Sequence, residues 1–175
     1  MSRFHGFTSK WILTGVGESE FAPNKTTSRA EFATMIVRAL GYSSESGTVS
    51  FKDISSDAWY ADSIGVAVEL GLVQGGKDGN FRPNDTITRQ EMASILNKAK
   101  ALAGKQLSEE AEVKTANFMD ADEVADWAKQ DVSKAVQEGL LIGTPGGKFQ
   151  PKQAVTRAEA ATVILRLLLK TEMIN

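Results

Sequence analysis

The chain has 175 residues, of which 42% are apolar and 24% are charged, with a formal net charge of −2 and no cysteine. The near balance of charge disfavours a nucleic-acid partner. The lack of cysteine excludes disulfides, thiolate metal sites and cysteine nucleophiles. The single histidine, His5, has no second imidazole with which to share a metal, so we expect neither a metal nor a cofactor. No apolar run approaches the roughly 18 residues of a membrane span, so we expect no membrane insertion.

One helix-opening pattern occurs three times along the chain. It reads SRAE at 28–31, TRQE at 88–91 and TRAE at 156–159, and each copy is followed by an apolar segment. Each copy also has a phenylalanine and a proline at fixed distances before its arginine; the phenylalanines are Phe21, Phe81 and Phe149. Self-similarity at fixed spacing predicts a repeat architecture, in which each unit buries its apolar face against its neighbours.

The pattern divides the chain into three units, at residues 1–42, 51–102 and 118–170, with polar linkers at 43–50 and 103–117. The first unit is incomplete, because the tryptophan that opens the other two would fall before Met1. Phe4, Phe7 and Trp11 keep a helical spacing, so a stub of the opening helix could remain, weakened by Gly6. We therefore expect either a fragment of a longer protein or a partner that completes the first unit.

Each complete unit is predicted to contain two helices joined by a glycine-rich connection. The first helix begins near Trp59 or Trp127 and ends at Gly71 or Gly139, where glycine can take the left-handed cap conformation. The connections VQGGKDGNFRPND and LIGTPGGKFQPKQ predict turns that carry one buried phenylalanine and a proline.

The second helix of each unit is predicted to begin at a capping box, in which a hydroxyl and a glutamate satisfy each other's backbone amides. The capping residues are Ser28 with Glu31, Thr88 with Glu91, and Thr156 with Glu159. Apolar stripes at helical spacing follow and predict the core. They comprise Phe32, Met35, Ile36, Ala39 and Leu40; Met92, Ile95, Leu96 and Ala99; and Val163, Ile164, Leu167 and Leu168. The predicted fold class is all-α, with three helix-loop-helix units.

These motifs together resemble the S-layer homology (SLH) domain. The resemblance covers about Lys10 to Leu169 and rests on FKDISSDAW, LGLVQGGKDGNFRPN and ITRQEMA, whose spaced residues recur in order. It implies three repeats in a pseudo-threefold, three-pronged spindle around a central helical bundle. It also implies noncovalent anchoring to a cell envelope, through a peptidoglycan-linked secondary cell wall polymer that is acidic and often pyruvylated. The ending LLLKTEMIN implies the C-terminal anchor of a larger extracellular protein, whose signal peptide and cargo domain lie upstream.

The motif arginines Arg29, Arg89 and Arg157 are the first candidates for glycan contact, as the resemblance implies. A cation in the first turn of a helix is disfavoured by the helix dipole. Because all three units place an arginine there, we expect another interaction of the arginine to offset this cost. A guanidinium beside free helix N–H groups would suit a carboxylate or a phosphate. The alternative is a salt bridge to a protein acid, with Asp53 or Asp120 as the suggested partner, and this does not exclude ligand contact by the same residues.

Two further sets of residues are candidates. Trp59 and Trp127 could stack on a sugar ring, although a tryptophan at the start of an amphipathic helix is more often a core residue. Gly15, Gly75 and Gly143 occupy equivalent places in the connections, where they could let a ligand approach the backbone or simply serve turn geometry.

Catalysis is not expected. KDGNFRPND lacks the alternating acids and distal glutamate of a calcium loop. The motif glutamates are committed to capping, and no other acid pair recurs in all three units to serve glycoside hydrolysis. The remaining alternative to a glycan anchor is a structural repeat module that mediates protein–protein interaction at the cell surface.

Overall fold

The structure is a computed structural model, and it describes residues 22–42, 50–104 and 118–174. In these ranges the helices are α1 (Arg29–Ala39), α2 (Ala61–Glu69), α3 (Arg89–Leu102), α4 (Lys129–Gln137) and α5 (Arg157–Lys170), with short 3-10 helices at Ala121–Glu123 and Asp126–Ala128. The same ranges contain isolated bridges but no strand, so the all-α prediction is confirmed. None of the described helices is both long and apolar enough to cross a bilayer.

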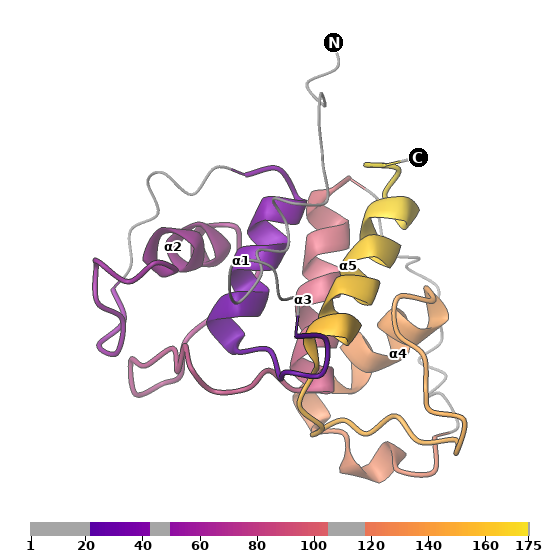
Figure 1. Cartoon of the computed structure of the whole chain (residues 1–175). Coiled ribbons are helices and arrows are strands. Elements are labelled where there is room, and N and C mark those ends of the chain that lie inside the picture. Colours follow the sequence, from indigo (N-terminus) through magenta and orange to yellow (C-terminus); the bar gives the residue numbers. More distant parts are fainter. Residues whose placement is uncertain (1–21, 43–49, 105–117, 175) are drawn as a thin grey trace.

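The second helices α1, α3 and α5 form the middle of the molecule (Figure 1). Helix α5 contacts both α1 and α3, while α2 packs on α1 and α4 packs on α3. Every residue of the three predicted core stripes is buried. Each opening helix therefore packs on the second helix of the preceding unit.

Both predicted kinds of helix end are confirmed. Ser28 Oγ accepts a hydrogen bond from the Glu31 amide at 3.1 Å, and Glu31 Oε2 accepts one from the Ser28 amide at 2.7 Å. The same reciprocal box opens α3 and α5. Gly71 and Gly139 directly follow the C-caps of α2 and α4, Leu70 and Glu138, and their φ angles of 69° and 64° are strained for any residue with a Cβ.

Three backbone hydrogen bonds join the units in a closed cycle. The residue before each N-cap donates to its counterpart in another unit: Thr27 N to Val155 O at 2.8 Å, Val155 N to Ile87 O at 2.9 Å, and Ile87 N to Thr27 O at 3.0 Å. All three side chains are buried. The cycle gives the described units an approximate threefold relation, while the three-pronged spindle stays a prediction.

Candidate functional site

The first turns of α1, α3 and α5 have no free amide. In α1, the Arg29 amide donates to Asp85 O at 2.9 Å, and the Ala30 amide donates to Pro83 O at 3.1 Å. The acceptors at α3 are Gln153 O and Pro151 O, and those at α5 are Lys25 O and Pro23 O. The expectation of free helix N–H groups beside each arginine is therefore wrong, because the backbone of another unit satisfies them.

Each motif arginine pairs with the motif glutamate of another unit. The closest N–O distances are 2.6 Å for Arg29–Glu91, 3.6 Å for Arg89–Glu159 and 3.9 Å for Arg157–Glu31. The pairs run round the molecule in the same cyclic order as the helix-start hydrogen bonds. The salt-bridge alternative thus holds, but with a different acid from the suggested Asp53 or Asp120. The charge partner that compensates each arginine for the helix dipole lies across a unit junction.

The arginine side chains also bind the connection of the neighbouring unit. Arg29 Nε donates to Phe81 O at 3.0 Å, and Arg89 Nε donates to Phe149 O at 2.7 Å. Each guanidinium carbon lies 4.9 Å from the centre of the same phenylalanine ring. Burial lowers the pKa of Arg89, and the charges of Glu159 and Asp120 oppose that shift. The side chains of Arg29 and Arg89 therefore each join two neighbouring units, in addition to any ligand that they contact.

Asp53 and Asp120 hold the connections of their own units. The carboxylate of Asp53 accepts from the amides of Phe81 and Arg82 at 2.8 and 2.7 Å. The carboxylate of Asp120 accepts from the amides of Phe149 and Gln150 at 2.8 Å each. Burial raises the pKa of each aspartate, but these hydrogen bonds outweigh it, so both pKa values lie below the usual range. The two residues therefore have a clear structural task.

Gly75 and Gly143 are explained by close packing. A Cβ on Gly75 would lie 2.2 Å from the Phe51 ring, and a Cβ on Gly143 would lie 2.3 Å from the Phe118 ring. Neither glycine has a positive φ, so turn geometry does not require them. Gly15 lies outside the described residues.

The two opening tryptophans are exposed. Trp59 is 63% exposed and Trp127 is 59% exposed, so the expectation that they are core residues is wrong. Each lies two residues before the first residue of its helix, α2 or α4. An indole left in solvent at this position is available to a ligand.

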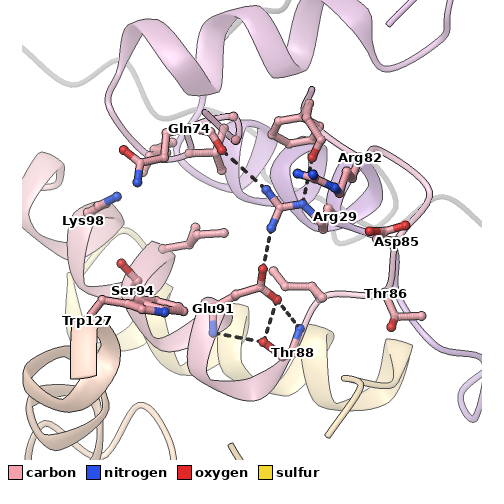
Figure 2. Close-up of a pocket in the computed structure, with 17 residues that line it drawn as sticks. Arg29, Gln74, Arg82, Asp85, Thr86, Thr88, Glu91, Ser94, Lys98 and Trp127 are labelled. Carbon is pink, nitrogen blue, oxygen red and sulfur yellow. Dashed lines mark hydrogen bonds and ion pairs between the residues drawn. The ribbon is translucent and has the colours of Figure 1, made fainter. Parts of the chain in front are cut away.

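A groove of about 580 Å³ lies where all three units meet. Its lining comprises Arg29, the second-unit connection (Leu72–Gly76, Phe81, Arg82 and Asp85–Thr88), the α3 residues Glu91, Ser94, Ile95 and Lys98, and Trp127. Figure 2 shows Lys98 and Trp127 on one side of the groove and Arg29 on the other. The groove therefore combines an aromatic surface with three cationic side chains, of which Arg82 is paired with Asp78, and with the acids Asp85 and Glu91.

Arg29 and Lys98 retain capacity for a ligand. The Arg29 side chain is 20% exposed, against 9% for Arg89 and 5% for Arg157. Its Nη2 makes only a long 3.5 Å contact, to Gln74 O, so some of its five N–H donors remain unused. Lys98 has no acid or carbonyl partner within the described parts of the chain. An anionic group in the groove would find both donors available.

The structure brings together three of the predicted glycan-binding residues, namely Arg29, Gly75 and Trp127. The described groove is not lined by Arg89, Arg157, Trp59, Gly143, Asp53 or Asp120. Sequence reasoning missed Lys98, although a signal was present: Arg38, Lys98 and Arg166 each lie nine residues after a motif arginine. No group of three or more potential ligand side chains in the described ranges could hold a metal ion.

Comparison with known proteins gives the family. The model of the S-layer homology domain matches residues 8–33, 50–93 and 117–161. An amylopullulanase of Thermoanaerobacterium thermosulfurigenes has 39% sequence identity to this chain, in a match that covers 93% of this chain and 9% of the relative. The surface-layer 125 kDa protein of Lysinibacillus sphaericus also has 39% identity, and its match covers 90% of this chain and 13% of the relative. The cellulosome-anchoring protein of Acetivibrio thermocellus has 31% identity, and its match covers 90% of this chain and 35% of the relative. The chain spans about a tenth to a third of these relatives, and with its three matched segments it belongs to the S-layer homology domain family.

Proposed function

We propose that this chain is a noncatalytic module that anchors a larger protein at the cell surface by binding an acidic cell-wall glycan in the groove of Arg29, Lys98 and Trp127. The relatives support anchoring, because one is named a surface-layer protein and another a cellulosome-anchoring protein. They also support the lack of catalysis. The same region is shared by a protein named as an enzyme and by proteins that are not, so it does not account for the enzyme activity.

The observation that carries the proposal is the meeting of Trp127, Lys98 and Arg29 in one groove, from three different units. The exposed indole offers a face on which a sugar ring can stack. A carboxylate, such as the pyruvate ketal of a pyruvylated sugar, accepts from the ammonium of Lys98 and from the remaining N–H groups of Arg29. The partner is therefore an acidic glycan of the secondary cell wall polymer, outside the cell.

Replacing Arg29 is a poor test of this proposal. Its guanidinium binds Phe81 O and Glu91, so Arg29→Ala would weaken the junction between the first and second units along with any ligand contact. Trp127 and Lys98 make no such junction contact, and their side chains are partly or largely exposed. Substitutions at these two residues separate binding from folding.

The test is cosedimentation of the chain with purified cell-wall sacculi, before and after removal of the secondary polymer. We expect Trp127→Ala and Lys98→Gln each to weaken binding at least tenfold, with unchanged melting temperatures. The matched controls are Trp59→Ala, an equally exposed tryptophan outside this groove, and Lys152→Gln, an exposed lysine elsewhere. Equal binding by all four variants, or full binding to stripped sacculi, would refute the proposal and favour a protein partner.

A further inference from the structure

The junction between α3 and α4 is held by polar side chains that are largely buried. Asn97 Nδ2 donates to the backbone oxygen of Asp131 at 2.9 Å and to its carboxylate at 3.1 Å. Lys100 forms an ion pair with Glu138, and the two side chains are 9% and 18% exposed. Asn97 and Lys100 are three residues apart and so share one face of α3. Two polar contacts therefore join this face to α4.

The equivalent junction between α1 and α2 lacks these polar residues. Alignment on the motif arginines and on the opening tryptophans gives four equivalent positions: Val37 for Asn97, Leu40 for Lys100, Ser63 for Asp131 and Leu70 for Glu138. Val37, Leu40 and Ser63 are buried, and Leu70 packs against the core. One junction thus has an ion pair at the position where the other has two leucines.

The opening helices α2 and α4 are otherwise alike on the face that they bury. Ile64 of α2 and Val132 of α4 are buried aliphatic residues at equivalent positions. Ala67 and Ala135 are buried alanines one turn later. Because the apolar parts of both helices are so similar, burial of apolar surface alone does not decide which second helix each of them covers.

Stability alone does not explain the polar junction. Removing the charges of Lys100 and Glu138 from water offsets much of their attraction, and an apolar pair of similar volume is often as stable. Asn97 also carries a cost, since its buried Oδ1 has no hydrogen-bond partner among the described residues. Val37, at the same position in α1, carries no such cost.

We propose that these polar residues select the docking partner, so that α3 accepts α4 and rejects α2. With α2 on α3, the ammonium of Lys100 would lie buried against Leu70. With α4 on α1, the carboxylate of Glu138 would lie buried against Leu40. Each wrong pairing leaves one charge buried without its partner, which is far less favourable than either correct pairing. The ion pair therefore provides specificity between similar repeats.

The first test places the wrong residue at the junction in the full chain. Glu138→Leu gives α4 the residue of α2, and Leu70→Glu gives α2 the residue of α4. We expect each to lower the melting temperature by several degrees. Combining Glu138→Leu with Lys100→Leu should recover most of that variant's loss. Unchanged melting temperatures for the two single variants, or no recovery in the combined one, would overturn the proposal.

The second test detects wrong docking directly, in a chain that has no cysteine of its own. Asn97 contacts Asp131 in the native junction, and Ser63 is the equivalent of Asp131. A disulfide between Ser63→Cys and Asn97→Cys therefore reports α2 docked on α3. The chain with this cysteine pair is refolded from urea in a glutathione redox buffer, with and without Lys100→Leu and Glu138→Leu. We expect at least tenfold more of the disulfide, within one chain or between copies, when both leucines are present.

The control pair is Val37→Cys with Ser63→Cys, which reports the native docking of α2 on α1. It should close in the chain with the ion pair and in the chain with both leucines, which shows that both fold. Equal yields of the disulfide between positions 63 and 97 in the two chains would overturn the proposal. The ion pair would then be a contact without selectivity.

Discussion

Arg29 and Glu91 belong to different units, yet their side chains meet at 2.6 Å. The same glutamate accepts from the Thr88 amide at 2.8 Å and so completes the capping box of α3. One carboxylate therefore both opens a helix and joins two units. This double task explains why the arginine and the glutamate recur together in every unit.

Because Glu91 has both roles, we expect its replacement to lower the free energy of unfolding more than the replacement of Thr88 does. Thr88→Ala removes a cap and should lower the free energy of unfolding by about 1 kcal/mol. Glu91→Ala removes the cap carboxylate and also leaves the partly buried Arg29 unpaired, so it should cost about 2 to 3 kcal/mol. Urea denaturation measures both values. Equal losses for the two variants would mean that the junction pair adds no stability.

Thr27 predicts a stabilising substitution. It lies in the buried cycle with Ile87 and Val155, but its hydroxyl oxygen has no hydrogen-bond partner. Because an unsatisfied buried polar group is unfavourable, Thr27→Val should raise the free energy of unfolding by about 1 kcal/mol. The control Thr26→Val changes an exposed residue and should be neutral. A loss of stability in the Thr27 variant would show that the hydroxyl is needed.

Asp120 predicts sensitivity to acid. Its folded-state pKa lies below the usual value, because amide hydrogen bonds outweigh the opposing effect of burial. A group with a depressed pKa contributes stability above its unfolded pKa of about 3.9, and loses it as the pH falls through the folded pKa. The urea midpoint should therefore fall steadily below about pH 5. Asp120→Asn should lower the midpoint at pH 7 and flatten this fall, whereas Asp122→Asn, at an exposed site, should change neither.

Gly143 predicts a steric loss with a specific rescue. A Cβ there would collide with the Phe118 ring at 2.3 Å, so Gly143→Ala should cost about 2 kcal/mol. Gly146→Ala, where the nearest atom would be 3.8 Å away, should be neutral or slightly stabilising. Adding Phe118→Leu should recover part of the loss at Gly143. If it recovers none, the collision with the ring is not the cause.

The sequence was sufficient for the features that depend on local chemistry. The capping boxes at Ser28, Thr88 and Thr156 follow from residues three apart, and the helix ends at Gly71 and Gly139 follow from backbone preference. The buried stripes follow from helical spacing. These elements were predicted because each is decided within one or two helical turns.

The features that depend on contacts between units could not be predicted from local sequence patterns. The partner of Arg29 lies 62 residues away and is selected by the cyclic arrangement of the units. Trp127 looks like a core residue within its own unit, but it lies where another unit leaves a groove. Gly75 and Gly143 look like turn residues until the rings of Phe51 and Phe118 are placed beside them.

The central claim is that the groove of Arg29, Lys98 and Trp127 recognises the acidic groups of a wall glycan. Its most direct test is calorimetric titration of the chain with solubilised secondary polymer, before and after selective removal of the acidic substituents. We predict binding to the intact polymer, with at least a tenfold loss on removing these groups, and no further loss when the treated polymer meets Lys98→Gln. Equal affinity for the intact and the treated polymer would contradict the account.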